Sequence, residues 1–222
     1  MTEVSRETPG PAPDLPAWLV GRSSLLEEYA QLLAGPGVDR GLIGPREAPR
    51  LWTRHLLNCA VVVDPEEGLV PLGARVTDVG SGAGLPGLVW AIARPDLSIA
   101  LVEPLLRRSV FLQEAVEALG LTDRVSVIRG RAEHAGDDLA RADVVTARAV
   151  APLERLLPWA VPLVRPGGAV VALKGSSAAE ELERVRESLP SWGISSAEVR
   201  LVGVGVVDPP TTVVVAVRGT AD

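Results

Sequence analysis

The sequence contains few residues of the kinds that build disulfides and metal centres. It has one cysteine, Cys59, and two histidines. A single cysteine cannot form an internal disulfide, and neither a CxxC pair nor a His/Cys cluster indicates zinc, so we predict no metal site. The sequence also lacks a long apolar run and a charged-then-apolar leader. We therefore expect a cytoplasmic protein with no membrane partner.

Lysine is almost absent. Lys174 is the only lysine among 22 lysine and arginine residues, and the net charge is −6. This charge argues against an overall basic nucleic-acid binder but leaves room for a local basic patch. Codon usage in a GC-rich genome is a sufficient explanation for scarce lysine. Lys174 nevertheless follows an apolar run and precedes a glycine, which leaves a functional role open.

Aromatic residues make up only 3% of the chain, whereas apolar residues make up 47%. This composition excludes a disordered or fibrous protein and suits a buried parallel sheet covered by helices. The length predicts one domain over residues 17–222, with a helical extension over 17–72 and the core over 73–222. The proline-rich residues 1–16 are expected to form a disordered tail.

Two amphipathic helices are predicted in the extension. The first, over 23–35, has Ser24 three residues before Glu27, the spacing of a capping box, and ends at the Gly-Pro-Gly of 35–37. The second, over 49–63, begins at a proline, a favoured first-turn residue. Its periodicity places Trp52, Leu56, Cys59 and Val63 on one side, with Arg50 and Arg54 roughly opposite.

From residue 75 onward, strand patterns alternate with helix patterns. The predicted strands are 75–80, 98–103, 124–130, 142–150, 168–175, 198–205 and 211–219, and the helices follow Gly84 and cover 105–120, 152–164 and 177–189. Such alternation implies right-handed crossovers and a mostly parallel sheet. The last two strands have no helix between them, so they are predicted to form an antiparallel hairpin at the sheet edge.

A glycine-rich segment carries the clearest functional signal. In "VTDVGSGAGLPG" a short strand ending at Asp78 runs directly into a loop with four glycines, Gly80, Gly82, Gly84 and Gly87. Glycines are required where a strand turns tightly into a helix and where the backbone approaches a ligand. Glu103 ends the next strand, at the spacing typical of an acidic residue that binds ribose hydroxyls. The order of these features predicts an adenosine-containing cofactor.

Two details favour S-adenosylmethionine over a dinucleotide. Pro86 lies between the last two glycines and removes one amide donor, whereas a dinucleotide loop needs its amides for a pyrophosphate. The predicted antiparallel hairpin is also common in enzymes that use S-adenosylmethionine. The sequence therefore predicts a Rossmann-like domain that binds S-adenosylmethionine, with a mostly parallel seven-stranded sheet.

Five segments, taken in order, resemble one known family. They are "WTRHLLNCAV", "VTDVGSGAGLPGLVWAIARPDLSIALVEPLLRRSVFLQE", "RGRAEH", "DVVTARAVAPLERLL" and "VRPGGAVVALKG". Together they resemble the ribosomal RNA small subunit methyltransferase G family, also called glucose-inhibited division protein B. The resemblance implies a class I methyltransferase that transfers a methyl group from S-adenosylmethionine to N7 of a guanine in 16S rRNA, in the decoding-region loop. It implies the small ribosomal subunit as the partner, and we expect a monomer.

The resemblance and the glycine loop together predict the site residues. The cofactor-binding residues are predicted to be Asp78, Gly80, Ser81, Gly82, Gly84, Leu85, Glu103, Ala132, Glu133 and Arg148. The RNA contacts are predicted to be Arg50, Arg54, His55, Arg107 and Lys174, and the catalytic candidates are Arg148 and Lys174. Arg54 and His55 match the family's "RH" pair, and Lys174 matches the lysine of its "LKG". The chain departs from the family at Asn58-Cys59, where an Asp-Ser pair is usual, and we interpret this position as structural.

Several of these residues have a second interpretation. Arg50, Arg54 and Arg107 can equally belong to solvated helix faces, His55 can be a packing residue, and the Lys174 stem can pack between helix and strand. We interpret Cys59 as a core residue, His134 as a surface residue and the Asp-Pro-Pro at 208–210 as a turn. Guanine N7 carries a lone pair and no proton, so its methylation needs neither a general base nor a covalent nucleophile.

Three other functional classes stay open at this point. An NAD-dependent oxidoreductase would bind NADH instead of S-adenosylmethionine. A small-molecule methyltransferase would suit the negative net charge and would act on a metabolite but not on ribosomal subunits. A non-catalytic RNA-binding protein of the same fold would bind rRNA without modifying it.

Overall fold

The computed structural model describes residues 9–132 and 141–220. In this part of the chain, seven strands form one sheet in the order β3-β2-β1-β4-β5-β7-β6. The strands are β1 Arg75–Val79, β2 Ser98–Val102, β3 Val125–Ile128, β4 Ala142–Arg148, β5 Val164–Lys174, β6 Ile194–Val202 and β7 Thr211–Arg218. The first five run parallel to one another, and β7 is antiparallel to both β5 and β6. The parallel sheet and its antiparallel hairpin at the edge are confirmed.

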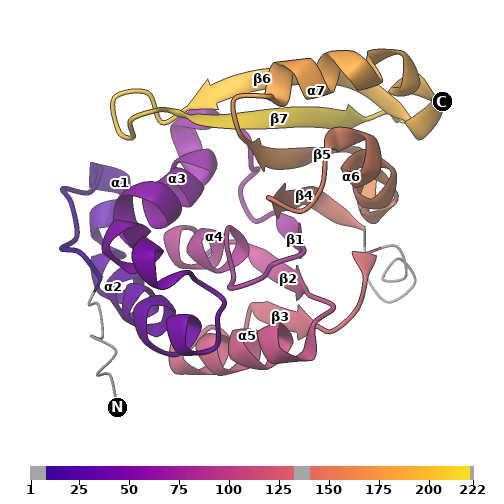
Figure 1. The fold of residues 1–222 in the computed structure, drawn as a ribbon. Helices are drawn as coiled ribbons and strands as arrows, with labels where there is room; N and C mark the ends of the chain where they lie inside the picture. Colours follow the sequence, from indigo (N-terminus) through magenta and orange to yellow (C-terminus); the bar gives the residue numbers. More distant parts are fainter. Residues whose placement is uncertain (1–8, 133–140, 221–222) are drawn as a thin grey trace.

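Helices cover both faces of this sheet (Figure 1). They are α1 Ala17–Val20, α2 Ser23–Leu32, α3 Leu57–Ala60, α4 Gly87–Ala93, α5 Leu106–Ala118, α6 Leu153–Ala160 and α7 Ala178–Val185. The helices α1 to α5 share one apolar core on one face, whereas α6 and α7 build a second core on the other face. Strands β1 and β4 lie between the two cores, which explains why most of their residues are buried, polar ones included.

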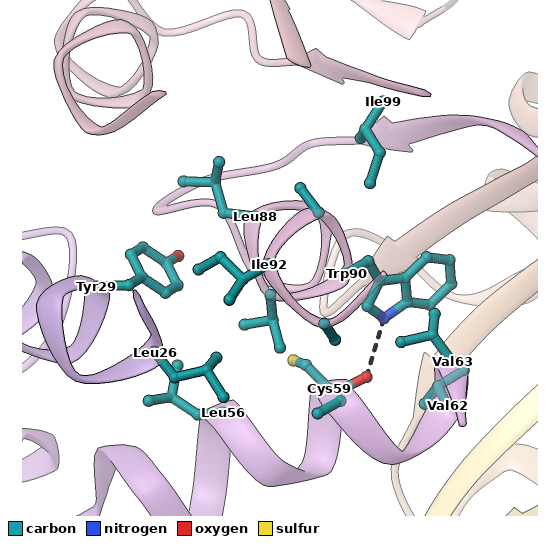
Figure 2. Close-up of a cluster of buried hydrophobic side chains, with 14 of the residues drawn as sticks. Leu26, Tyr29, Leu56, Cys59, Val62, Val63, Leu88, Trp90, Ile92 and Ile99 are labelled. Atoms are coloured by element: carbon teal, nitrogen blue, oxygen red, sulfur yellow. Dashed lines mark hydrogen bonds between the residues drawn. The ribbon is translucent and has the colours of Figure 1, made fainter. Parts of the chain in front are cut away.

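The N-terminal helices are part of the larger core. Figure 2 shows Tyr29 of α2 and Cys59 of α3 beside Trp90 and Ile92 of α4, all of them buried. The Trp90 indole donates a hydrogen bond to the main-chain oxygen of Cys59 at 2.9 Å. Because buried aromatic nitrogens need a partner, this contact ties α3 to α4 in one relative position. The interpretation of Cys59 as a core residue is confirmed.

The first predicted helix differs from the structure at both ends. Arg22, not Ser24, precedes α2, and no side chain caps the helix, so the capping-box prediction was wrong. The physical reason is that α1 ends only two residues earlier and the chain enters α2 from a turn that is already wound. Helical winding also continues through the π turn Leu33–Gly37, where Pro36 was expected to end it. A widened turn accommodates the carbonyl clash and lost donor of an internal proline.

The second predicted helix is irregular but faces the expected way. A 3-10 segment, Pro45–Arg50, leads into the π turn Trp52–Leu56, then α3, then the 3-10 turn Val61–Val63. Its four predicted inward residues are all buried, and Arg50 and Arg54 are exposed. The arginines therefore point away from the core, as the periodicity predicted.

Candidate active site

The glycine loop between β1 and α4 is shaped by its backbone. Gly80, Gly82 and Gly84 all have positive φ angles, of 68°, 60° and 99°. The amides of Gly80 and Ser81 donate to the main-chain oxygen of Val102, at 2.8 and 3.2 Å. The loop is therefore held against the end of β2 in a conformation that residues with a side chain rarely adopt.

Two of these glycines also lie too close to neighbours for a side chain. A Cβ atom on Gly80 would lie 2.8 Å from the Val150 side chain, and one on Gly84 would lie 2.5 Å from Leu88. Gly80 is thus packed beneath the segment that follows β4. This contact joins the first and fourth strands at the point where the strand order reverses, which is where doubly wound folds bind their ligands.

Glu103 holds the loop from the next strand. Its side chain is buried, one carboxylate oxygen accepts from the Gly82 amide at 2.9 Å, and the other accepts from the Leu105 amide at 3.0 Å. Each oxygen can accept a second hydrogen bond. The contact with a ribose stays a prediction, and Glu103 also acts on the loop conformation itself.

Asp78 is a buried carboxylate with an incomplete set of partners. One oxygen accepts from the Gly87 amide at 3.0 Å, and the other has no partner among the described residues. Burial raises the pKa of Asp78 to about 7, against the opposing effect of the Gly87 amide. When such a buried, partly unpartnered carboxylate is ionised, a nearby cation or hydrogen-bond donor stabilises it.

A small apolar pocket of about 160 Å³ lies beside the loop. Val79, Gly80, Val102, Pro104, Gly130, Arg131, Ala132, Val150 and Trp159 line it. Ala132 and Gly80 occupy predicted cofactor positions here. Ser81 and Leu85 do not line the pocket: the Ser81 hydroxyl is buried and donates to the main chain of Asp78, and Leu85 packs against the core. Glu133 and His134 lie outside the described residues.

A larger cleft of about 780 Å³ opens on the other side of Val150. It is formed by Thr53–His55 and Asn58, by the chain after β4, by the end of β5 with Glu181, and by Asp208–Thr212 before β7. Val150 lines both spaces, so the pocket and the cleft meet at this side chain. The two spaces can therefore hold a cofactor and a substrate next to each other.

Arg148 ends β4 and turns toward α3. Its guanidinium donates to Nδ1 of His55 at 2.6 Å, to the main-chain oxygen of Arg54 at 3.3 Å and to Sγ of Cys59 at 3.3 Å. On its other side, Nε2 of His55 lies 3.0 Å from Glu47. Burial, then Arg148, lowers the pKa of His55, and the Glu47 contact opposes this effect. His55 is therefore neutral at ordinary pH.

Lys174 ends β5 with its side chain only 10% exposed. Its ammonium donates to the main-chain oxygen of Ala151 at 2.8 Å and to Glu181 at 2.7 Å. Glu181 also accepts from the Leu153 amide and the Ser177 hydroxyl. These contacts hold the segment that carries Val150, so Lys174 stabilises a wall of the cleft. Contact with RNA or the target base stays a prediction.

The family model described as rRNA small subunit methyltransferase G matches residues 22–204. The chain belongs to the rRNA small subunit methyltransferase G family. It is 60% identical over 198 residues to "Ribosomal RNA small subunit methyltransferase G" of Salinispora arenicola, covering 87% of this chain and 80% of that protein. It is 62% identical over 188 residues to the protein of the same name from Thermobifida fusca, covering 85% and 77%.

Solved methyltransferase structures share the fold of this family member. An O-methyltransferase family protein from Burkholderia thailandensis aligns with a TM-score of 0.58 at 15% identity, over 89% of this chain and 63% of that one. The O-methyltransferase from Bacillus cereus, solved in complex with SAH, aligns with a TM-score of 0.55 at 17% identity, over 88% and 90%. The class I methyltransferase fold is confirmed, and family and fold together support S-adenosylmethionine as the cofactor.

The described residues fit this cofactor. Gly80 lines the pocket beside the loop, the pocket is apolar enough for a flat ring, and the unpartnered Asp78 oxygen suits a cationic ligand, which S-adenosylmethionine is. Within residues 9–132 and 141–220, no group of three or more acidic, His or Cys side chains is placed to hold a metal ion. No described helix has the length and apolar character needed to cross a bilayer.

The structure gathers some of the predicted residues and separates others. Arg54, His55, Arg148 and Lys174 all line the cleft, although they come from different parts of the chain. Arg50 and Arg107 are exposed but do not line it. The cleft therefore presents a compact cationic set from the π turn Trp52–Leu56, β4 and β5, with Arg50 and Arg107 on the outer surface.

Three features of this family member's cleft were missed from the sequence: Val150, Glu181 and the Asp208–Pro210 turn. The turn was correctly interpreted as a turn, but it is also a cleft wall. The antiparallel direction of β7 was the available signal, because an antiparallel strand beside β5 must begin at the carboxyl edge of the sheet, where ligands bind. Val150 and Glu181 had no local signal.

Proposed function

We propose that this protein transfers the methyl group of S-adenosylmethionine to N7 of a guanine in 16S rRNA, in the decoding-region loop of the small ribosomal subunit. The family supports S-adenosylmethionine-dependent methylation of rRNA. The choice of base and atom is supported by the chemistry of the cleft. We also propose the cofactor and RNA contacts named from the sequence as the residues that carry the reaction.

The cofactor supplies an electrophilic methyl group on a sulfonium. The chain supplies a place to hold it: the glycine loop, the apolar pocket beside it and the Asp78 and Glu103 carboxylates beneath the loop. Val150 separates this pocket from the cleft, so its position controls how closely a base in the cleft approaches the cofactor side. Alignment of this kind is the main contribution an enzyme makes to such a transfer.

One observation carries the proposal: the partly buried acid–base groups of the cleft are already engaged by protein partners. His55 is held between Arg148 and Glu47, and Glu181 is paired with Lys174. Neither is free to remove a proton from a substrate. Guanine N7 has no proton to lose and is an acceptor, so it suits a cleft that offers cationic donors.

The test is methylation of ribosomal subunits. Purified protein and labelled S-adenosylmethionine are incubated with 30S subunits from a strain that lacks the gene, and 16S rRNA is mapped by mass spectrometry. We expect one new 7-methylguanine. A label at another atom or base would reject the N7 assignment. Cofactor binding without label in RNA would redirect the search to small molecules, the alternative that the fold also permits.

A further inference from the structure

A line of three side chains runs from the outer surface into the cleft. Glu47 accepts at 3.0 Å from Nε2 of His55, and Nδ1 of His55 lies 2.6 Å from the Arg148 guanidinium. These residues belong to the 3-10 segment Pro45–Arg50, the π turn Trp52–Leu56 and β4. Arg148 lines the cleft, whereas Glu47 does not, so Glu47 acts there through the cleft residues it contacts, which are His55 and, at 3.5 Å, Arg54.

The hydrogen bonds allow only one arrangement of protons on the His55 ring. A guanidinium has donors and no acceptor, so Nδ1 must present its lone pair to Arg148. A neutral imidazole then carries its proton on Nε2, which faces the Glu47 carboxylate. Glu47 accepts that proton's hydrogen bond. It therefore stabilises the tautomer that Arg148 requires.

Arg148 depends on this acceptor for its position. Its other two partners, the main-chain oxygen of Arg54 and Sγ of Cys59, are both at 3.3 Å, and the sulfur is a weak acceptor. The contact with His55 is the shortest of the three and fixes the plane of the guanidinium. All three partners are uncharged when His55 is neutral, so the positive charge of Arg148 stays available to the cleft.

We propose that Glu47 is a positioning residue for methyl transfer, which sets the tautomer of His55 and so holds Arg148 in the cleft. This proposal rests on the function proposed above. Glu47 touches neither cofactor pocket nor cleft, and its side chain is 31% exposed, so neither the loop sequence nor the cleft lining points to it.

The arrangement predicts an acid limit for activity. Protonation of His55 would place an N–H on Nδ1 against the Arg148 guanidinium and remove its acceptor. The charged groups that face His55 are Glu47, which favours the protonated ring, and Arg54 and Arg148, which disfavour it. Lys174, Glu181 and Asp208 line the remaining walls of the same cleft. Loss of the Glu47 charge should therefore lower the pKa of His55 and move the acid limit to lower pH.

The first experiment needs no activity. Protein labelled with 15N-histidine is titrated by NMR as wild type and as Glu47→Gln, both in a His134→Gln background that leaves His55 as the one histidine. We expect a neutral ring protonated on Nε2, and a lower His55 pKa in the Glu47→Gln protein. A ring protonated on Nδ1, or equal pKa values, would overturn the proposal.

The second experiment measures kcat and KM on 30S subunits across pH. Glu47→Ala should lower kcat by about 10- to 100-fold because Arg148 loses its fixed orientation. Glu47→Gln keeps an acceptor for Nε2 and should restore kcat, with its acid limit moved to lower pH. The matched control is Glu67→Gln, a partly exposed carboxylate of the same extension that pairs with Arg200 and should change neither quantity.

The outcomes separate the two proposals. If the wild type leaves 16S rRNA unmodified, the proposed function fails, and the NMR titration still decides the tautomer. If the wild type methylates and both Glu47 variants keep its kcat and pH profile, the positioning role alone fails. If Glu47→Ala does not fold, the acid limit of Glu47→Gln decides, because a purely structural residue would leave that limit unmoved.

Discussion

The two sides of Val150 are built in different ways. On the cofactor side, the backbone determines the shape of the site. Three glycines have positive φ angles, loop amides donate to Val102 and Glu103, and glycines pack under neighbouring side chains. On the cleft side, hydrogen bonds between long polar side chains determine the shape of the site, namely those of Arg148, His55, Lys174 and Glu181. The cofactor side depends on the absence of side chains at a few glycine positions. The cleft side depends on hydrogen bonds and ion pairs between side chains from separate elements.

This difference changes how each side tolerates substitution. A glycine at positive φ cannot be replaced without strain, whatever the new residue is. A side-chain network can lose one member and keep its fold, or lose two members together and regain stability. We therefore expect single changes on the cofactor side to abolish binding, and changes on the cleft side to separate stability from activity.

The largest effect is expected at Gly80. A valine there would combine a positive φ angle with a contact of 2.8 Å to Val150, at a cost of about 2 kcal/mol or more in strain. We expect Gly80→Val to lose S-adenosylmethionine binding in calorimetry. The control is Gly120→Val, which has a φ of 63° but nothing within 4 Å, and should lose stability while keeping cofactor affinity. Normal binding by Gly80→Val would contradict the location of the pocket.

A smaller effect is expected at Lys174, measured by urea unfolding and by methylation. Lys174→Met leaves the partly buried Glu181 without its ion pair and should lower the free energy of unfolding by about 2–3 kcal/mol. Adding Glu181→Gln removes the unpaired charge and should restore much of that stability. If methylation stays absent in the stable double variant, Lys174 meets the RNA. If methylation returns, Lys174 serves only to hold the cleft wall.

Asp78 should give a pH-dependent effect. Its folded pKa of about 7 lies above the ordinary value of 3.8, so the folded state binds more protons between these values and stability falls as pH rises through this range. Asp78→Asn removes the titration. It should raise the free energy of unfolding by about 1–2 kcal/mol near pH 8 and flatten its pH dependence. Lower stability of Asp78→Asn near pH 8 would show that the carboxylate is satisfied in the folded protein.

The smallest effect on stability is expected at Arg54. Its side chain is 58% exposed and 3.5 Å from Glu47, so Arg54→Ala should change the free energy of unfolding by less than about 0.5 kcal/mol. It should nevertheless weaken rRNA binding and reduce the salt dependence of the binding constant by the amount expected for the loss of about one phosphate contact. Arg186→Ala is the matched control, because this arginine is 59% exposed, pairs with Glu183 and lies outside the cleft. An equal salt dependence of rRNA binding for both variants would show that Arg54 does not contact the RNA.

Much of the fold could be predicted because its signals are local. Alternating strand and helix patterns, a glycine loop directly after a strand and a missing helix before the last strand each lie within a short stretch of chain. The errors in the first helix arose where neighbouring elements overrode a local signal: α1 replaced the expected Ser24 cap, and a π turn carried the helix past Pro36.

The sequence by itself determined the alternation of strands and helices, the glycine loop, the class of cofactor and the outward face of the arginine helix, because these depend on residues close together along the chain. Only the tertiary structure decided what Arg148 and Lys174 contact. The Arg148 contact with His55 joins residues 93 positions apart, and the Lys174 contact with Ala151 joins residues 23 apart. The periodicity of the sequence does not predict contacts between residues so far apart, because they form only when separate elements pack together.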